Sequence, residues 1–291
     1  VLFRSTVSKG IIAVSLFCDT AGRIWLITSN ESGLFLFSDG LFHTIPQIDD
    51  YFSKNSDDGK YFATAMTQDI NGDFWIGMAE KGLIRLRNGE FTKVHTGTVL
   101  DNTSTWSIYV LSDGRMVFGT ERGVVSYNNG GFYEAKKKEL ATAKINKIMR
   151  DREGNIWLAT DRNGIGKLTH GKFSVMHFGI AANAIAEDEM GRVWIGTDTG
   201  VRCYVGEKEV KNALTEYTNG YRIRHVGITH AGEILVSCYT KPAQLLYNPR
   251  TMIVKSWTTD DGLAGNKVRL AIETNPNEYY VGTTTGLSII H

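Results

Sequence analysis

The sequence is poor in proline and cysteine, and it has no long hydrophobic run. It holds four prolines and three cysteines in 291 residues. Cys18, Cys203 and Cys238 lie far apart, which excludes a disulfide framework and a zinc pattern, so we interpret them as small buried hydrophobic residues. No apolar run approaches the roughly 18 residues that span a bilayer, and no signal peptide is visible. We therefore expect no membrane contact by this segment.

An excess of charge of either sign is also lacking. The chain has 32 basic and 31 acidic residues, a formal net charge of +1, and this balance gives no field that would attract nucleic acid. The seven histidines show no metal-ligand spacing, and the sequence has no nucleophile elbow, phosphate-binding loop or HExxH motif. The stretch "DINGD" at 69–73 looks like the start of a calcium loop, but Phe74 stands where that loop needs glycine. The sequence thus predicts no catalytic centre, no metal site and no cofactor.

What the chain does have is a repeat built on glycine and tryptophan. One copy reads "GNIWLATDRNG" at 154–164, and related copies recur after 37 to 50 residues. One strand is expected before the first glycine, a second after it, a third after the second glycine, and a fourth after that. Aligned on the second strand, the copies occupy 23–28, 73–78, 115–120, 155–160, 192–197, 233–238 and 278–283.

Each copy therefore predicts a four-stranded antiparallel meander of about forty residues. Such a meander cannot bury its apolar face alone, and radial stacking of sheets solves this problem. We expect an all-β fold, a seven-bladed β-propeller of four-stranded antiparallel blades that occupies 6–291. The blades are expected at approximately 7–44, 60–96, 104–135, 143–178, 182–212, 222–258 and 266–291, the last of them incomplete.

The two ends of the chain raise separate expectations. The last blade stops on its third strand, so its fourth strand is expected from elsewhere, with residues 1–8 as the candidate. The peptide "VLFRS" at 1–5 is also what the end of a common sequencing adapter encodes, and the chain does not begin with Met. We predict that 1–5 are an assembly scar on a metagenomic fragment. In that case the natural closing strand, and any further blades, lie beyond the fragment.

The recurring tryptophans are predicted to be a packing device on the second strand, directed at the adjacent blade. Repetition argues for packing, because an active site needs its residue only once. The aspartates of the preceding Asp-x-x-Gly turns are expected to accept N–H groups of their own turn. The tryptophans are Trp25, Trp75, Trp157 and Trp194, and the aspartates are Asp19, Asp69, Asp151 and Asp188. The charged stretch "EAKKKELATAK" at 134–144 is expected to be a solvated loop or short helix.

Two stretches carry a family resemblance. They read "INKIMRDREGNIWLATDRNGIGKL" at 145–168 and "AIAEDEMGRVWIGTDTGVRCY" at 184–204. Both closely resemble the two-component regulator propeller repeat, and the likeness extends over 11–290, with "THAGEILVSCYTKPAQLLY" at 229–247 departing most. The resemblance implies the periplasmic or otherwise extracytoplasmic sensory part of a receptor that commonly senses glycan fragments. It also implies a C-terminal output domain in the parent protein, a histidine kinase or a diguanylate cyclase.

One row of residues predicts a ligand site. In propellers the first strand lines the central channel, and its start lies on the face that carries the loops between blades. Trp106 is expected to stack on a sugar, the asparagines to donate to hydroxyls, and the arginines to hold a carboxylate or sulfate. The alternative is that strand starts at a wet channel mouth are simply polar. The row comprises Val14, Thr64, Trp106, Asn146, Asn183, Arg224 and Arg269, and loops on the same face add Glu80, Glu121, Arg122, Asp161, Arg162 and Tyr239.

Three functions remain open from the sequence. The first is a non-catalytic sensory propeller of a bacterial signal-transduction receptor, binding a glycan or another small polar ligand at the channel mouth. The second is a protein-interaction or dimerisation scaffold, with a homodimer as the partner and a large exposed apolar patch as its sign. The third is a propeller polysaccharide lyase or glycosidase, which needs paired carboxylates or a His/Tyr cluster at the mouth. The predicted row holds no carboxylate, which favours the sensor.

Overall fold

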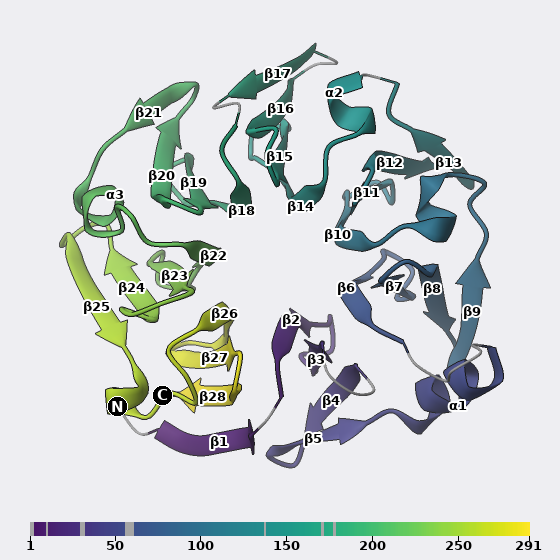
Figure 1. Cartoon of the computed structure of the whole chain (residues 1–291), viewed down its shortest axis with the longest axis horizontal. Helices are drawn as coiled ribbons and strands as arrows, with labels where there is room; N and C mark the ends of the chain where they lie inside the picture. The colour runs from purple at the N-terminus through teal and green to yellow at the C-terminus, as the bar shows by residue number, and fades with distance from the viewer. Residues whose placement is uncertain are drawn as a thin grey trace. The chain divides into compact units, whose positions relative to one another are not determined.

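The protein consists of seven four-stranded antiparallel sheets, so the predicted seven-bladed β-propeller is confirmed (Figure 1). A computed structural model describes residues 3–9, 11–29, 33–55, 61–136, 138–169, 172–176 and 179–291. By its contacts the chain forms two compact units, which we call the N-terminal unit (residues 14–148) and the C-terminal unit (residues 149–291 with 1–13). The unit boundaries pass through the first strands of blades 1 and 4.

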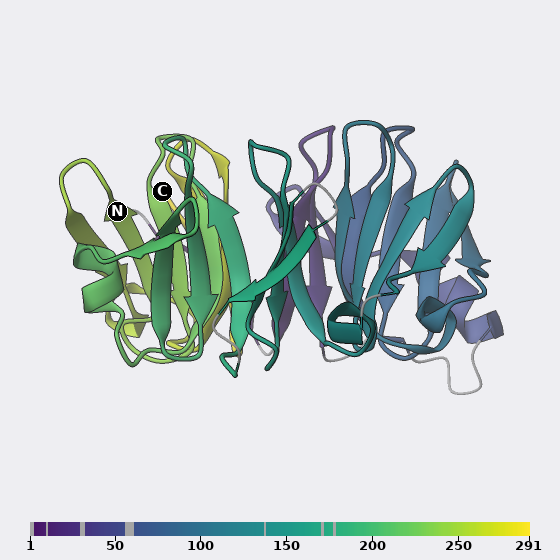
Figure 2. The same ribbon diagram turned by 90° about the horizontal axis from the view of Figure 1, so that it is seen from above.

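In blades 1 to 6 the strands follow one another in chain order, and in Figure 2 the strands of a blade run between connecting loops at their two ends. Blades 1 to 3 are β2 (Ala13–Cys18), β3 (Ile24–Thr28), β4 (Leu34–Ser38), β5 (Leu41–Thr44); β6 (Ala63–Gln68), β7 (Phe74–Met78), β8 (Gly82–Arg87), β9 (Glu90–Val94); and β10 (Thr105–Val110), β11 (Met116–Thr120), β12 (Gly123–Asn128), β13 (Gly131–Glu134). Blades 4 and 5 are β14 (Ile145–Arg150), β15 (Ile156–Thr160), β16 (Ile165–Thr169), β17 (Lys172–Met176); and β18 (Ala182–Glu187), β19 (Arg192–Thr197), β20 (Gly200–Val205), β21 (Lys208–Val210). Blades 6 and 7 are β22 (Ile223–Ile228), β23 (Ile234–Cys238), β24 (Gln244–Asn248), β25 (Ile253–Trp257); and β26 (Val268–Asn275), β27 (Glu278–Thr283), β28 (Gly286–Ile290) with β1 (Phe3–Lys9).

Short helices occupy several connections between blades. They are α1 (Pro46–Asn55), η1 (Val99–Asn102), α2 (Lys138–Ala141), α3 (Ala213–Tyr217) and η2 (Thr259–Asp261). The helix α2 falls in the charged stretch for which a loop or short helix was expected, whereas the sequence pattern did not predict α1 or α3.

Blade 7 takes its fourth strand from the beginning of the chain, as predicted. The strand β1 pairs antiparallel with β28, with Phe3 opposite Ile290 and Lys9 opposite Gly286, and its register shifts between Arg4 and Ser8. The scar at 1–5 stays a prediction.

The repeated tryptophans pack against the next blade, which confirms their predicted role. Trp25 of blade 1 lies 5.0 Å from Phe74 of blade 2, centroid to centroid, and Trp194 of blade 5 lies 6.0 Å from Tyr247 of blade 6. The ring of Trp194 is fully buried. The same arrangement joins Trp75 to Phe118 and Trp157 to Tyr204.

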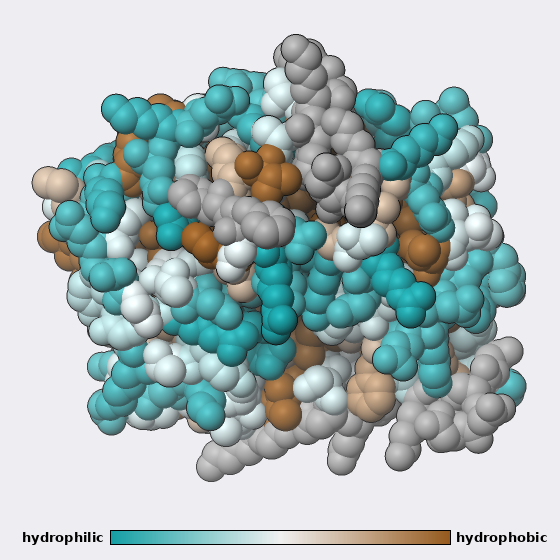
Figure 3. Space-filling view, turned by 45° about the horizontal axis from the view of Figure 1, so that its top comes forward, coloured by the Kyte–Doolittle hydropathy of each residue, from teal (hydrophilic) through white to brown (hydrophobic). Residues whose placement is uncertain are grey.

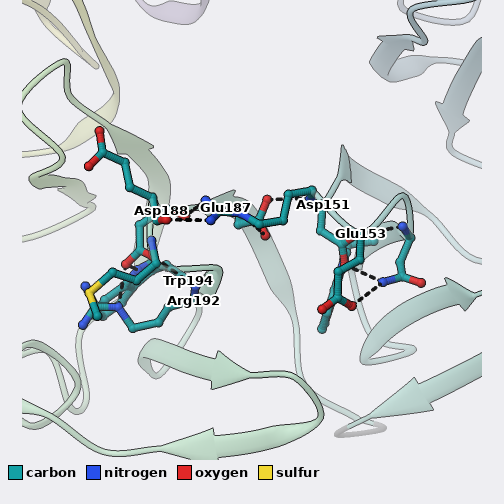
Figure 4. Close-up of polar contacts among 11 residues, drawn as sticks. Asp151, Glu153, Glu187, Asp188, Arg192 and Trp194 are labelled. Carbon is teal, nitrogen blue, oxygen red and sulfur yellow. Dashed lines mark hydrogen bonds and ion pairs between the residues drawn. The ribbon is translucent and has the colours of Figure 1, made fainter.

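Each turn aspartate fixes both its turn and its tryptophan, and Figure 4 shows the turn that contains Asp188 with Trp194 beside it. Asp188 accepts the N–H groups of Met190 and Arg192 at 2.9 and 3.0 Å, which confirms the expected turn bonds, and its other oxygen accepts the Trp194 indole N–H at 2.8 Å. The indole bond was not predicted from the sequence. It recurs from Trp25 to Asp19, from Trp75 to Asp69 and from Trp157 to Asp151, at 2.7 to 2.9 Å.

Every one of these tryptophans also has a cation over its ring. In blade 5 it is Arg192, which precedes the tryptophan in the same strand, with its guanidinium 5.4 Å from the ring centroid. In blade 4 that place holds Asn155, and the cation is Lys167, which stands opposite Trp157 on β16. The other two pairs are Arg23 over Trp25 and Arg85 over Trp75. Each ring thus has one cation, which comes from the second strand or just before it in some blades and from the third strand in others.

The glycine after the tryptophan allows the next blade to approach closely. A Cβ on Gly196 would lie 2.7 Å from Cγ2 of Ile223 in blade 6. The threonine that follows, Thr197, donates to the carbonyl of Gly200 at 2.7 Å and so closes the loop between the second and third strands. Equivalent close approaches join Gly77 to Thr105, Gly119 to Ile145 and Gly282 to Ala13.

Candidate ligand-binding site

The row predicted to line the channel mouth coincides with a β-bulge in the first strand. In blade 6, Ile223 pairs with Cys238 and His225 with Ser237, so Arg224 is the extra residue between them. A bulge redirects its extra side chain out of the regular alternation of the strand, and bulges often lie beside functional sites. The same register shift occurs at Thr64, Trp106, Asn183 and Arg269.

In the C-terminal unit, the bulges of blades 6 and 7 bring cations together around one tyrosine. Tyr239, in the loop after β23, has the guanidinium carbons of Arg222 and Arg224 at 5.6 and 5.7 Å from its ring centroid. The ammonium of Lys267 lies at 5.8 Å from the same ring. Arg269 is close enough to Arg224 to act on its charge. We call these five residues the cationic cluster.

Asp198 and Asn183 form one wall beside the cationic cluster. The carboxylate of Asp198 accepts from Nε of Arg222 and from Nδ2 of Asn183, both at 2.9 Å. Nδ2 of Asn183 also donates to the carbonyl of Ile223 at 2.9 Å. The two N–H groups of the Asn183 amide are thus directed at protein acceptors, and this asparagine positions the start of β22 and the residue before Arg224.

The cations outnumber the acidic groups that contact them. Four cationic side chains belong to the cluster, and Asp198 is paired with Arg222. Among the described residues, the guanidinium of Arg224 makes no hydrogen bond or ion pair, and the buried Nε of Arg269 has no hydrogen-bond partner. Burial, and then the charges of Arg269 and Arg222, lower the pKa of Arg224. A buried donor without a partner is costly and marks a place where a ligand or water belongs.

Trp106 lies in the N-terminal unit and has partners of its own. Its indole N–H donates to the carboxylate of Glu121, the ammonium of Lys144 stands 4.3 Å from its ring centroid, and Lys144 and Glu121 are 3.4 Å apart. The predicted stacking surface is therefore partly covered by a cation. This group balances one positive charge with one negative charge, in contrast to the cationic cluster.

The remaining predicted residues contribute less to a site. The hydroxyl of Thr64 is buried and lies within hydrogen-bonding distance of the carbonyls of Gly77 and Thr105, so it joins blade 2 to blade 3. Asn146 and Val14 lie on first strands, half-buried. Arg122 and Arg162 are exposed loop residues.

Three residues of this site were missed from the sequence: Arg222 and Lys267 of the cationic cluster, and Asp198 beside it. Arg222 and Lys267 each stand two residues before a bulge arginine, in "RIR" at 222–224 and "KVR" at 267–269. This basic-apolar-basic pattern in consecutive blades was a readable signal. Asp198 gave none, because its approach to Arg222 depends on how two loops fold.

Other kinds of site find little support in the described parts of the chain. No group of His, Cys, Asp or Glu side chains there is arranged to hold a metal ion. Within those same ranges, the helices are too short and too polar for a membrane span. On the face shown in Figure 3, hydrophilic side chains predominate and the hydrophobic ones form small separate patches.

The fold is a seven-bladed β-propeller, and comparison with known proteins shows what the chain is similar to. The sequence profile of the family described as "Two component regulator propeller" matches residues 139–162. The matched residues are similar to one repeat of this family, as the sequence resemblance implied. A search of curated protein sequences gives no match.

Solved structures of similar fold include receptor domains. The extracellular domain of a protein described as the hybrid two component system BT4673 from B. thetaiotaomicron superposes with a TM-score of 0.79 at 16% identity, covering 99% of this chain and 39% of that one. The corresponding domain of BT3049 from the same organism gives 0.76 at 17% identity, covering 97% and 40%. The chain thus spans about two fifths of these receptor domains.

An enzyme shares the fold as well. A catalytically inactive virginiamycin B lyase from Staphylococcus aureus, in a structure with quinupristin, gives a TM-score of 0.76 at 10% identity, covering 100% of this chain and 98% of that one. At this identity the likeness concerns the fold alone, and function has to be argued from the side chains of this chain.

Proposed function

We propose that the chain is the non-catalytic, ligand-binding part of an extracytoplasmic receptor, and that it binds a small polar ligand such as an acidic glycan fragment at the cationic cluster. The observation that carries the proposal is the convergence of Arg222, Arg224 and Lys267 on Tyr239, with Arg269 close to Arg224. Among the described residues of the cluster, Arg222 is the one paired with a carboxylate. Cations this close together repel one another, and a bound anion would offset that repulsion. In the parent protein, ligand binding would be passed to an output domain.

The cluster supports binding better than catalysis. A glycosidase needs two carboxyl groups on either side of the bond that it cleaves, whereas among the described residues Asp198 is the one carboxylate that an ion pair joins to the cluster. That carboxylate is held by Arg222 and Asn183, both at 2.9 Å, so it is placed as a structural counter-ion and not as a free base. A lyase reaction would need a base with access to the ligand, and Tyr239 is the only side chain of the cluster itself that is not a cation.

A binding screen tests the proposal. Wild-type protein and an Arg224→Ala variant would be applied to an immobilised panel of neutral and acidic glycans. Arg250→Ala serves as the matched control, because Arg250 lies in the turn after β24 with its side chain 79% exposed. We expect binding by the wild type and the control, and a loss of about tenfold or more in the Arg224 variant. Equal binding by all three proteins, or none by the wild type, would count against the site.

A further inference from the structure

The donors of the cationic cluster approach from several chain segments. Arg224 lies on β22 and Arg269 on β26, two strands that lie side by side in the C-terminal unit (Figure 1). Lys267 precedes β26 and is exposed, whereas Arg224 and Arg269 are half-buried. Arg224 and Lys267 lie at similar distances from the Tyr239 ring, 5.7 and 5.8 Å. A ligand group at this place therefore meets donors from three chain positions.

The shape of the anion follows from the number of donors. A carboxylate offers two oxygens in one plane, which suits a single guanidinium fork. A sulfate or phosphate ester offers three terminal oxygens that point in different directions. Three separate cations, none of them paired with a carboxylate among the described residues, match the second geometry better than the first.

From this we infer that the cationic cluster recognises a tetrahedral oxyanion, a sulfate or phosphate monoester on a small polar ligand, with Arg224, Arg269 and Lys267 each facing one terminal oxygen. The inference rests on the proposed function of this site and narrows its ligand class. Asp198 then acts as an internal competitor, because it holds Arg222 away from the ligand.

A set of hexoses that differ at one carbon tests the inference. Glucose 6-sulfate, glucose 6-phosphate, glucuronate and glucose carry a sulfate ester, a phosphate ester, a carboxylate and a hydroxyl on the same ring. Their affinities would be measured by calorimetry at constant ionic strength. We expect at least one ester to bind about tenfold or more tighter than glucuronate, and glucose to bind most weakly. The tighter of the two esters identifies the oxyanion.

Two variants separate recognition from folding. Lys267→Ala removes an exposed side chain, and it should lower the affinity for the preferred ester to about that for glucuronate while leaving glucuronate nearly unchanged. Asp198→Asn should raise the affinity for every anionic probe, a gain that misfolding cannot produce. The exposed Arg250→Ala variant again serves as the control.

The outcomes distinguish this inference from the proposed function. Glucuronate binding as tightly as the esters, or an ester preference that survives in Lys267→Ala, would overturn the tetrahedral oxyanion. Failure of both esters to bind, while a glycan from the panel still requires Arg224, would overturn it too and leave the proposed function standing. Failure of the esters together with a negative panel would overturn both.

Discussion

The bond between Asp188 and Trp194 can be tested by copying another blade of the same protein. Blade 6 carries Thr229 and Leu235 at the two equivalent positions. The four blades with an aspartate six residues before the tryptophan position have the tryptophan, and the three blades with Leu111, Thr229 or Thr274 there lack it. This co-occurrence predicts that the two residues act as a pair. The perturbation is therefore Asp188→Thr, Trp194→Leu and the double variant.

The structure sets the magnitudes. Asp188→Thr leaves the fully buried indole N–H without its acceptor at 2.8 Å, which costs about 1–3 kcal/mol for that group. Trp194→Leu removes part of a fully buried ring, a loss of about 2–4 kcal/mol, and it takes one donor from a buried carboxylate. Both single changes break the same bond, and the double variant breaks it once. A hydrogen bond to a charged group contributes about 1.5–3 kcal/mol. The double variant should therefore lose less unfolding free energy than the two single variants lose together, by about that amount.

The free energies of unfolding of the wild type, the two single variants and the double variant complete a double-mutant cycle. They would be measured by urea unfolding, followed by tryptophan fluorescence and circular dichroism. The fluorescence of Trp194 itself is lost in two of the proteins, so circular dichroism supplies the common signal. Losses that add within about 0.5 kcal/mol, as for independent sites, would refute the pairing. The tryptophan would then be a packing residue whose indole bond contributes nothing.

Two further predictions concern contacts between blades. Gly196→Ala should lower the free energy of unfolding by about 1–3 kcal/mol through overpacking, since its Cβ would lie 2.7 Å from Ile223. Gly227→Ala should lower it less, because its Cβ would meet the edge of the His225 ring at 3.2 Å. Equal urea midpoints for the two variants would contradict this prediction. Burial alone would raise the pKa of Glu273, but N–H donors from the backbone and from His230 hold it below the usual range. Its contribution to stability is therefore complete above the unfolded pKa of about 4.3 and is lost as pH falls below it. Glu273→Gln should reduce the loss of stability between pH 6 and pH 3, and an unchanged pH slope would refute the assignment.

The regular parts of the fold could be predicted because each repeat solves the same packing problem. Trp194, the glycine two residues later and the turn before them recur with nearly constant spacing, so the blades and their second strands were readable. The helix α1 lies outside the repeat, in a connection between blades. Its buried residues Ile48 and Phe52 are four positions apart, which is the spacing of one helix face. The signal was present but too short to stand out.

The links between neighbouring turns were harder to see. Arg152 of blade 4 donates its backbone N–H to Glu187 of blade 5 at 2.8 Å, and its guanidinium reaches the same carboxylate at 3.3 Å (Figure 4). His230 contacts Glu273 in the same way, and Thr20 contacts Gln68. In these three cases the acceptor side chain stands at or near the end of a first strand, but the donor residue differs in each case. Every residue except proline has a backbone N–H, so the sequence does not indicate which N–H makes this contact, and only the folded structure shows it.

The position of the site has a physical reason that the repeat itself supplies. Residues such as Ile223 and Ala184 must fit against a neighbouring blade, and their size is therefore constrained. A bulge residue is not opposed by a partner across its strand pair, so its side chain is less restricted by packing. Across the blades this position holds valine, threonine, tryptophan, asparagine and arginine, whereas the residue before it is alanine, threonine, isoleucine or valine. A chain that repeats one scaffold can thus place a different chemical group at the same point of each blade. In blades 6 and 7 that group is an arginine, and the proposed anion site rests on these two neighbouring arginines.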